Sequence, residues 1–94
     1  LLGGAGNDRL SGGTQADTFV FIDNWGVDVV TDFAVSVAGE VIDLSGVAAI
    51  ISFADLTANH LSQSLGNSII TVGIHTVTIL SVTNAQLSAG DFLF

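Results

Sequence analysis

The clearest alternation of polar and apolar positions lies late in the chain. Residues 76–80 (Thr-Val-Thr-Ile-Leu) alternate hydroxyl and aliphatic side chains, which predicts a half-buried strand with Val77 and Ile79 directed inward. The apolar segment 68–72 predicts a second strand, and the Gly-Ile-His bend at 73–75 would join the two as a hairpin.

Two polar clusters mark helix starts in the same half. Residues 52–55 (Ser-Phe-Ala-Asp) have the spacing of a capping box and predict a short helix with Ser52 as its N-cap, reaching about Leu61. A turn is expected at Gly66-Asn67, and a helical turn at 84–87 before a final strand. Such short strands and helices predict a β-sandwich-like cap.

The first twenty residues follow a period of nine. Residues 3–11 (GGAGNDRLS) follow the pattern GGxGxDxUx, in which U is a large apolar residue. They run without a gap into residues 12–20 (GGTQADTFV), which match the same pattern except at Gln15. The glycines permit the left-handed angles of a tight turn, and each xUx triplet predicts a short strand with Leu10 or Phe19 inward. A flexible loop or two ordinary β-turns would be the alternative.

The excess of acidic residues limits the kinds of partner that the chain can bind. The chain has one cation, Arg9, against nine acids, seven of which lie in the first 43 residues. This balance disfavours nucleic acid and anionic membrane surfaces as partners, and favours a cation from solution that neutralises the carboxylates. Stacked turns would gather carboxylates and peptide carbonyls, a set of oxygen donors that suits Ca²⁺. Without cysteine, no disulfide can supply the stability instead.

Residues 3–20 resemble the RTX (hemolysin-type calcium-binding) repeats of serralysin-type proteases, mannuronan epimerase R-modules and related type I-secreted proteins. Residues 26–33 and 40–46 resemble the segments that follow the last repeat there, and residues 90–94 resemble the C-terminal ends. The resemblance implies an all-β fold: the end of a right-handed parallel β-roll, plus the cap with its short helix. Residues 1–26 would be the terminal roll turns and residues 27–94 the capping and secretion-signal segment, in one folding unit.

The resemblance also implies which residues bind calcium. In the family each turn aspartate bridges ions on both sides, together with carbonyls of the first four positions of the repeat. The residues at these positions are Gly3, Gly4, Ala5, Gly6 and Asp8, then Gly12, Gly13, Thr14, Gln15 and Asp17. Gln15 departs from the pattern, because it stands where the third glycine is expected.

Two repeats make one coil in the family, so the first turn would stack on residues 21–26, which keep Asp23 as an obvious ligand. Asp28 and Asp32, four apart on one face of an extended chain, are expected to close the last site opposite Asp17. Their alternative role is that of solvated edge-strand and turn residues. We therefore expect Asp17 with Asp28 and Asp32 to form a better site than the Asp8 repeat. Asp43 is expected to accept backbone amides.

These features predict a non-catalytic calcium-binding module of a larger secreted protein. It would fold on extracellular calcium, cap the roll and carry at residues 91–94 the signal read by the type I secretion machinery, although an edge strand would also explain these residues. Leu1 and Leu2 fit the end of an earlier repeat, so an upstream domain of the same parent chain is expected. The longest apolar run, residues 47–51, is too short for membrane insertion.

Other functions have less support in the sequence. Polysaccharide binding is the alternative, with Trp25 as a candidate stacking residue, but packing against the first strands is the simpler role for it. An enzyme would need a cluster of acid, base or nucleophile, and the HExxH, GxSxG and phosphate-loop motifs are absent. His60 and His75 have no second ligand at metal spacing, and we expect structural roles for both.

Overall fold

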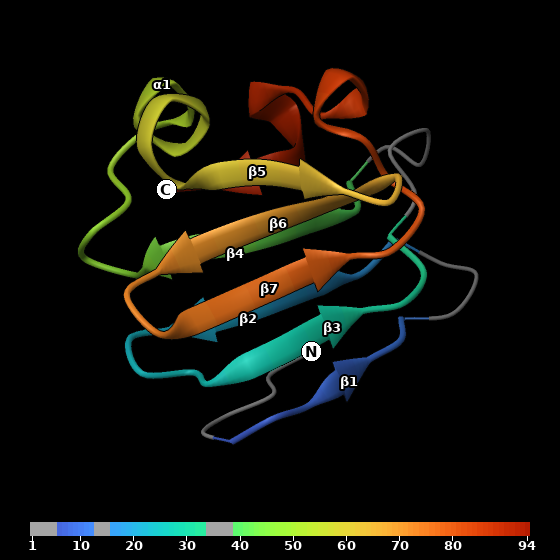
Figure 1. Ribbon diagram of the computed structural model, residues 1–94, viewed down its shortest axis with the longest axis horizontal. Coiled ribbons are helices and arrows are strands. Elements are labelled where there is room, and N and C mark those ends of the chain that lie inside the picture. The colour runs from blue at the N-terminus through green and yellow to red at the C-terminus, as the bar shows by residue number, and fades with distance from the viewer. Residues whose placement is uncertain (1–5, 13–15, 34–38) are drawn as a thin grey trace.

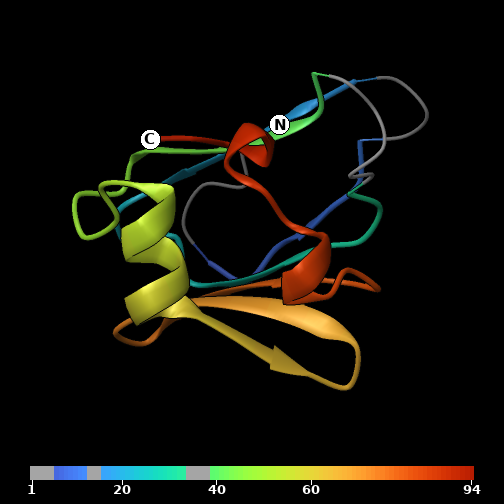
Figure 2. The same cartoon turned by 90° about the horizontal axis from the view of Figure 1, so that it is seen from above.

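The computed structural model of the protein describes residues 6–12, 16–33 and 39–94. Its strands form two sheets, which lie as two layers with the helical segments gathered at one edge (Figures 1 and 2). The five-stranded sheet has the order β1 (Arg9–Leu10), β3 (Val27–Val30), β7 (His75–Ile79), β6 (Asn67–Val72) and β5 (Leu61–Ser64). The three-stranded sheet has the order β2 (Thr18–Ile22), β4 (Val41–Gly46) and β8 (Phe92–Leu93).

The first four strands wind between the layers. Strand β3 stacks in parallel on β1, with Leu10 opposite Val30, and β4 stacks in parallel on β2, with Phe19 opposite Ile42. Strands that alternate between two sheets and stack in parallel are the arrangement expected of a β-roll. The register between β1 and β3 pairs residues 20 apart, such as Arg9 and Val29, rather than the 18 of two nonapeptides.

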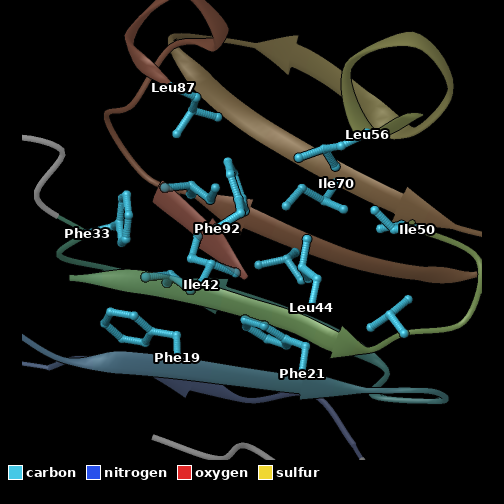
Figure 3. Packing of buried hydrophobic residues seen from close by; sticks show 14 of the residues in the cluster. Phe19, Phe21, Phe33, Ile42, Leu44, Ile50, Leu56, Ile70, Leu87 and Phe92 are labelled. Atoms are coloured by element: carbon cyan, nitrogen blue, oxygen red, sulfur yellow. The ribbon is translucent and has the colours of Figure 1, made fainter. Parts of the chain in front are cut away.

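The core lies between the two sheets. Figure 3 shows Phe19 and Phe21 of β2 beside Ile42 and Leu44 of β4, all of them at most 1% exposed. The inward direction predicted for Phe19 is confirmed, and Leu10 is partly buried against the same cluster. Burying each such side chain stabilises the fold by about 1.5–3 kcal/mol.

The predicted helix begins at Ser52, whose hydroxyl accepts a hydrogen bond from the Asp55 amide (3.1 Å). One α-helical turn, α1 (Phe53–Asp55), continues as the π-helical segment η1 (Leu56–His60), one residue short of the expected end. Two 3-10 turns follow later, η2 (Asn84–Gln86) and η3 (Ala89–Asp91), and η2 confirms the expected helical turn. No helix of the described residues is long and apolar enough to span a membrane.

The predicted hairpin of β6 and β7 is confirmed, although β7 begins at His75, which was expected in the bend, and ends one residue earlier than expected. Val77 and Ile79 are fully buried, as predicted. Strand β5 was not predicted, because its Leu-Ser-Gln-Ser sequence does not alternate apolar and polar residues. In the structure its last three residues are exposed. Leu65 and Gly66, both with positive φ (53° and 80°), make the tight turn from β5 to β6.

The second half does not form a separate sandwich. Strand β7 hydrogen-bonds to β3, and β8 hydrogen-bonds to β4, so that the C-terminal half extends both sheets of the roll (Figure 1). The cap is therefore continuous with the roll through backbone pairing as well as through the shared core.

Candidate metal site

Asp8 lies in the first turn, and Asp28 is stacked on it in the turn one coil later. The Asp8 amide donates to Oδ1 of Asp28 (2.8 Å), and the Asp8 carbonyl accepts from the Val29 amide (2.8 Å). Asp28 is fully buried. Its Oδ2 atom, and Oδ2 of Asp8, are buried without a hydrogen-bond partner among the described residues.

Residues 23–31 are a third copy of the nonapeptide, which the sequence analysis missed. Gly26 lies over Gly6, the Val27 amide donates to Oδ1 of Asn7 (3.0 Å), and Asp28 lies over Asp8. Asp23 and Asn24 stand at the two leading glycine positions, and Asn24 adopts the positive φ (65°) that asparagine tolerates better than most residues. The surviving signal is Gly-x-Asp-x-Val-x at 26–31, in register with 6–11.

Gly12 is the centre of a second group. Its amide donates to Oδ1 of Asp32 (2.9 Å), and the Ser11 hydroxyl donates to Oδ2 of the same carboxylate (2.9 Å). The Asp17 carboxylate also packs against Gly12, so closely that any side chain at Gly12 would overlap it. Oδ2 of Asp17 is buried without a hydrogen-bond partner among the residues described.

The structure does not bring Asp28 and Asp32 to one point. Asp28 contacts Asp8, whereas Asp32 contacts Gly12, the residue against which Asp17 packs. A strand advances about 3.3 Å per residue, so four residues span roughly 13 Å. The ligands of one calcium ion lie about 2.3–2.6 Å from it. Two carboxylates on the same face of a strand can therefore share an ion only if they are closer than this in sequence, or if they lie on strands stacked on each other. Asp28 therefore belongs with Asp8, and not with Asp17 and Asp32 as expected from the sequence.

Asp23 points away from this site. Its side chain is exposed, its carboxylate accepts from the Ala48 amide (3.2 Å), and its own amide donates to the Gly46 carbonyl (3.2 Å). Asp23 thus ties its turn to the next coil. The remaining predicted carbonyl ligands, apart from Gly6 and Gly12, lie outside the described residues: Gly3, Gly4, Ala5, Gly13, Thr14 and Gln15.

Electrostatics set Asp28 apart from an ordinary structural carboxylate. Burial raises the pKa of Asp28 most, the Asp8 amide opposes this by donating to the carboxylate, and the nearby Asp8 charge raises the pKa further. Within the described part of the chain, no three acidic, histidine or cysteine side chains converge as a metal-binding group. An ion here would need backbone carbonyls in addition to the paired carboxylates. The donor set, oxygen only, fits Ca²⁺.

Other candidate side chains have structural contacts. Trp25 is 2% exposed and its indole donates to the Thr76 carbonyl (2.9 Å), so it packs as expected and offers no free face for a sugar. Asp43 accepts from both the amide and the hydroxyl of Ser45 (2.9 and 2.6 Å), which confirms its role as an acceptor and lowers its pKa. His60 and His75 both bond to backbone groups.

No protein-family model and no curated protein sequence matches this chain. A protein of known structure shares its fold. The crystal structure of the extracellular lipase LipA from Serratia marcescens superposes with a TM-score of 0.80 over 98% of this chain, at 21% sequence identity. This chain spans only 14% of the length of the lipase chain, so the likeness concerns the fold of one part of that protein.

Proposed function

We propose that this chain is a non-catalytic calcium-binding module at the end of a right-handed β-roll in a secreted protein. The observation that carries the proposal is the set of three buried carboxylate oxygens, on Asp8, Asp17 and Asp28, that have no hydrogen-bond donor among residues 6–12, 16–33 and 39–94. A buried charge without a partner costs several kcal/mol, so a cation is the natural complement.

Two groups of ligands follow from the contacts. Asp8 and Asp28 would hold one ion between their stacked turns, and Asp17 with Asp32 would hold another beside Gly12, each with carbonyls of the glycine turns. Calcium would supply the positive charge that a chain of net charge −8 lacks. Right-handed winding is supported by the general rule that parallel strand–crossover–strand units are right-handed in about 98% of cases.

Calcium binding would be coupled to folding. Extracellular calcium modules have dissociation constants of about 10⁻⁴ to 10⁻³ M. At a tenfold excess over such a constant, each site adds roughly 1.4 kcal/mol to the free energy of unfolding. Low calcium would leave the acidic turns loose during export, and calcium outside the cell would order them.

Export by a type I secretion system, from a signal at residues 91–94, is part of the same proposal. Likeness in fold to 14% of an extracellular lipase supports a secreted parent protein longer than this chain. Leu93 and Phe94 are 47% and 39% exposed at the end of β8, where a receptor could reach them. Polysaccharide binding loses its candidate aromatic residue, since Trp25 is buried.

The decisive experiment compares Asp28→Asn with Asp23→Asn, because both remove one negative charge and only Asp28 lies in the proposed site. Thermal unfolding would be followed with calcium and with a chelator. We expect calcium to raise the Tm of the parent chain and of Asp23→Asn equally, and to raise that of Asp28→Asn much less. Without calcium, Asp28→Asn should be more stable than the parent. An equal calcium response in all three proteins would contradict the proposal.

A further inference from the structure

Side-chain and backbone hydrogen bonds join Trp25-Gly26 to His75-Thr76, at the start of the pairing between β3 and β7. The Trp25 indole donates to the Thr76 carbonyl (2.9 Å), the Thr76 amide donates to the Gly26 carbonyl (3.0 Å), and the Gly26 amide donates to Nδ1 of His75 (3.0 Å). The Trp25 and His75 rings also lie against each other, with centroids 5.6 Å apart. This junction is where β7 starts along β3.

The bond from Gly26 to His75 fixes the protonation of the imidazole. A backbone amide can only donate, so Nδ1 of His75 must carry a lone pair and the ring proton must sit on Nε2. A proton on Nδ1 would set one N–H against another and leave the Gly26 amide without its acceptor. The contact with the Trp25 ring tolerates either charge state, because an indole face attracts cations.

We propose that His75 is a proton-sensitive latch: the neutral ring fastens the cap to the last roll turn, and protonation in mild acid loosens it. Histidine is the side chain whose ordinary titration range, near pH 6.5, allows this outside the cell. The inference concerns the contact between β7 and the turn before β3, and it does not rest on the proposed calcium binding.

The charged groups of the neighbouring elements are directed elsewhere. Asp28 on β3 faces the Asp8 amide, and Asp23 in the preceding turn accepts from Ala48. On β6, the partner of His75 is the apolar Val72. Within the described part of the chain, no carboxylate forms an ion pair with His75 that would compensate for the lost bond.

The other histidine has the opposite surroundings. Both ring nitrogens of His60 face carbonyl oxygens, of Thr71 (3.0 Å) and Ala49 (3.1 Å), and the Asp55 carboxylate lies 3.7 Å from Nε2. Acceptors on every side suit a protonated ring. The two rings therefore differ in their hydrogen-bond partners, and the test reads amides that lie beside His75 and not beside His60.

The test measures amide hydrogen exchange of Gly26 and Thr76 at pH 7.5 and 5.5, corrected for intrinsic exchange, at saturating calcium. His75→Asn is the matched variant, because asparagine Oδ1 can accept in place of Nδ1 but does not titrate. In the parent chain we expect protection of both amides to fall about tenfold in acid, the effect of losing one partly buried hydrogen bond. In His75→Asn it should change by less than about twofold.

Side-chain ¹⁵N shifts of the unmodified chain give a second readout that needs no variant. At pH 7.5 they should show Nδ1 of His75 unprotonated. A protonated Nδ1 at pH 7.5 would overturn the latch. Equal protection at both pH values in the parent, or an equal loss in His75→Asn, would overturn it as well.

Discussion

Gly26 packs its backbone directly against the carbonyl oxygen of Gly6, in the turn one coil earlier, and both glycines have positive φ (99° and 101°). The positive φ and the close contact together favour glycine at position 26 more strongly than either would alone. Together they identify the place where two turns of the roll touch through their backbones, next to the stacked pair Asp8 and Asp28.

Gly26→Ala should therefore be far more destabilising than an equivalent change elsewhere. Gly66 is the matched control, since it also has positive φ (80°) but open space around its Cα. Gly66→Ala should cost about 1–2 kcal/mol from backbone strain. Gly26→Ala should cost roughly 2 kcal/mol more, because the two turns must separate. Urea unfolding measures both, and similar losses would contradict the close contact.

The core makes a second prediction at Phe19, which is fully buried between the sheets. Phe19→Ala should lower the free energy of unfolding by about 3–5 kcal/mol, enough to unfold a marginal domain of this size. Phe19→Leu, which keeps more of the volume, should cost roughly 1–2 kcal/mol and remain measurable. Leu65→Ala, at a side chain 98% exposed, should change stability by less than about 0.5 kcal/mol.

The two proposed sites, Asp8 with Asp28 and Asp17 with Asp32, should bind calcium independently of each other. Isothermal calorimetry of Asp28→Asn and of Asp32→Asn should each show one fewer ion bound, and the double variant should show two fewer, because the carboxylates contact different turns. Asp55→Asn, in the helix cap, is the control and should bind like the parent chain. A double variant that loses no more than either single one would place both residues on one ion.

The sequence allowed much of this arrangement to be predicted where local chemistry decides it. The nonapeptide period gave the inward position of Phe19, and the Ser52 capping box gave the helix start, because a tight turn and an N-cap depend on residues close in sequence. The β6–β7 hairpin followed for the same reason.

Pairing between distant segments could not be predicted in the same way. The stacking of Asp28 on Asp8 depends on how many residues one coil takes, and two extra residues after the second repeat hid the third copy. Counting strand rise along the chain would have separated Asp28 from Asp32 without a structure. No local sequence pattern indicates that β7 and β8 pair with β3 and β4, because any exposed strand edge could have paired with them.

Asp43 gives a prediction for acid stability. The amide and hydroxyl of Ser45 hold its pKa below the ordinary 3.8, because both donate to the ionised carboxylate. A carboxylate with a depressed folded pKa stabilises the fold above its unfolded value, and this stabilisation is lost as pH falls through the folded value. Ser45→Ala removes one donor, so the variant should lose less stability than the parent as the pH falls from 5 through the folded pKa.

The measurement is the Tm against pH in calcium-free buffer, so that bound calcium does not contribute, together with an NMR titration of the Asp43 carboxyl. Ser62→Ala is the control, since that hydroxyl faces the Ile69 carbonyl. Its acid profile should follow the parent. The Asp43 midpoint should move up in Ser45→Ala, toward the ordinary value, because the remaining amide alone stabilises the charge less. An unmoved midpoint would mean that the backbone amide, rather than the hydroxyl, is responsible for the lowered pKa.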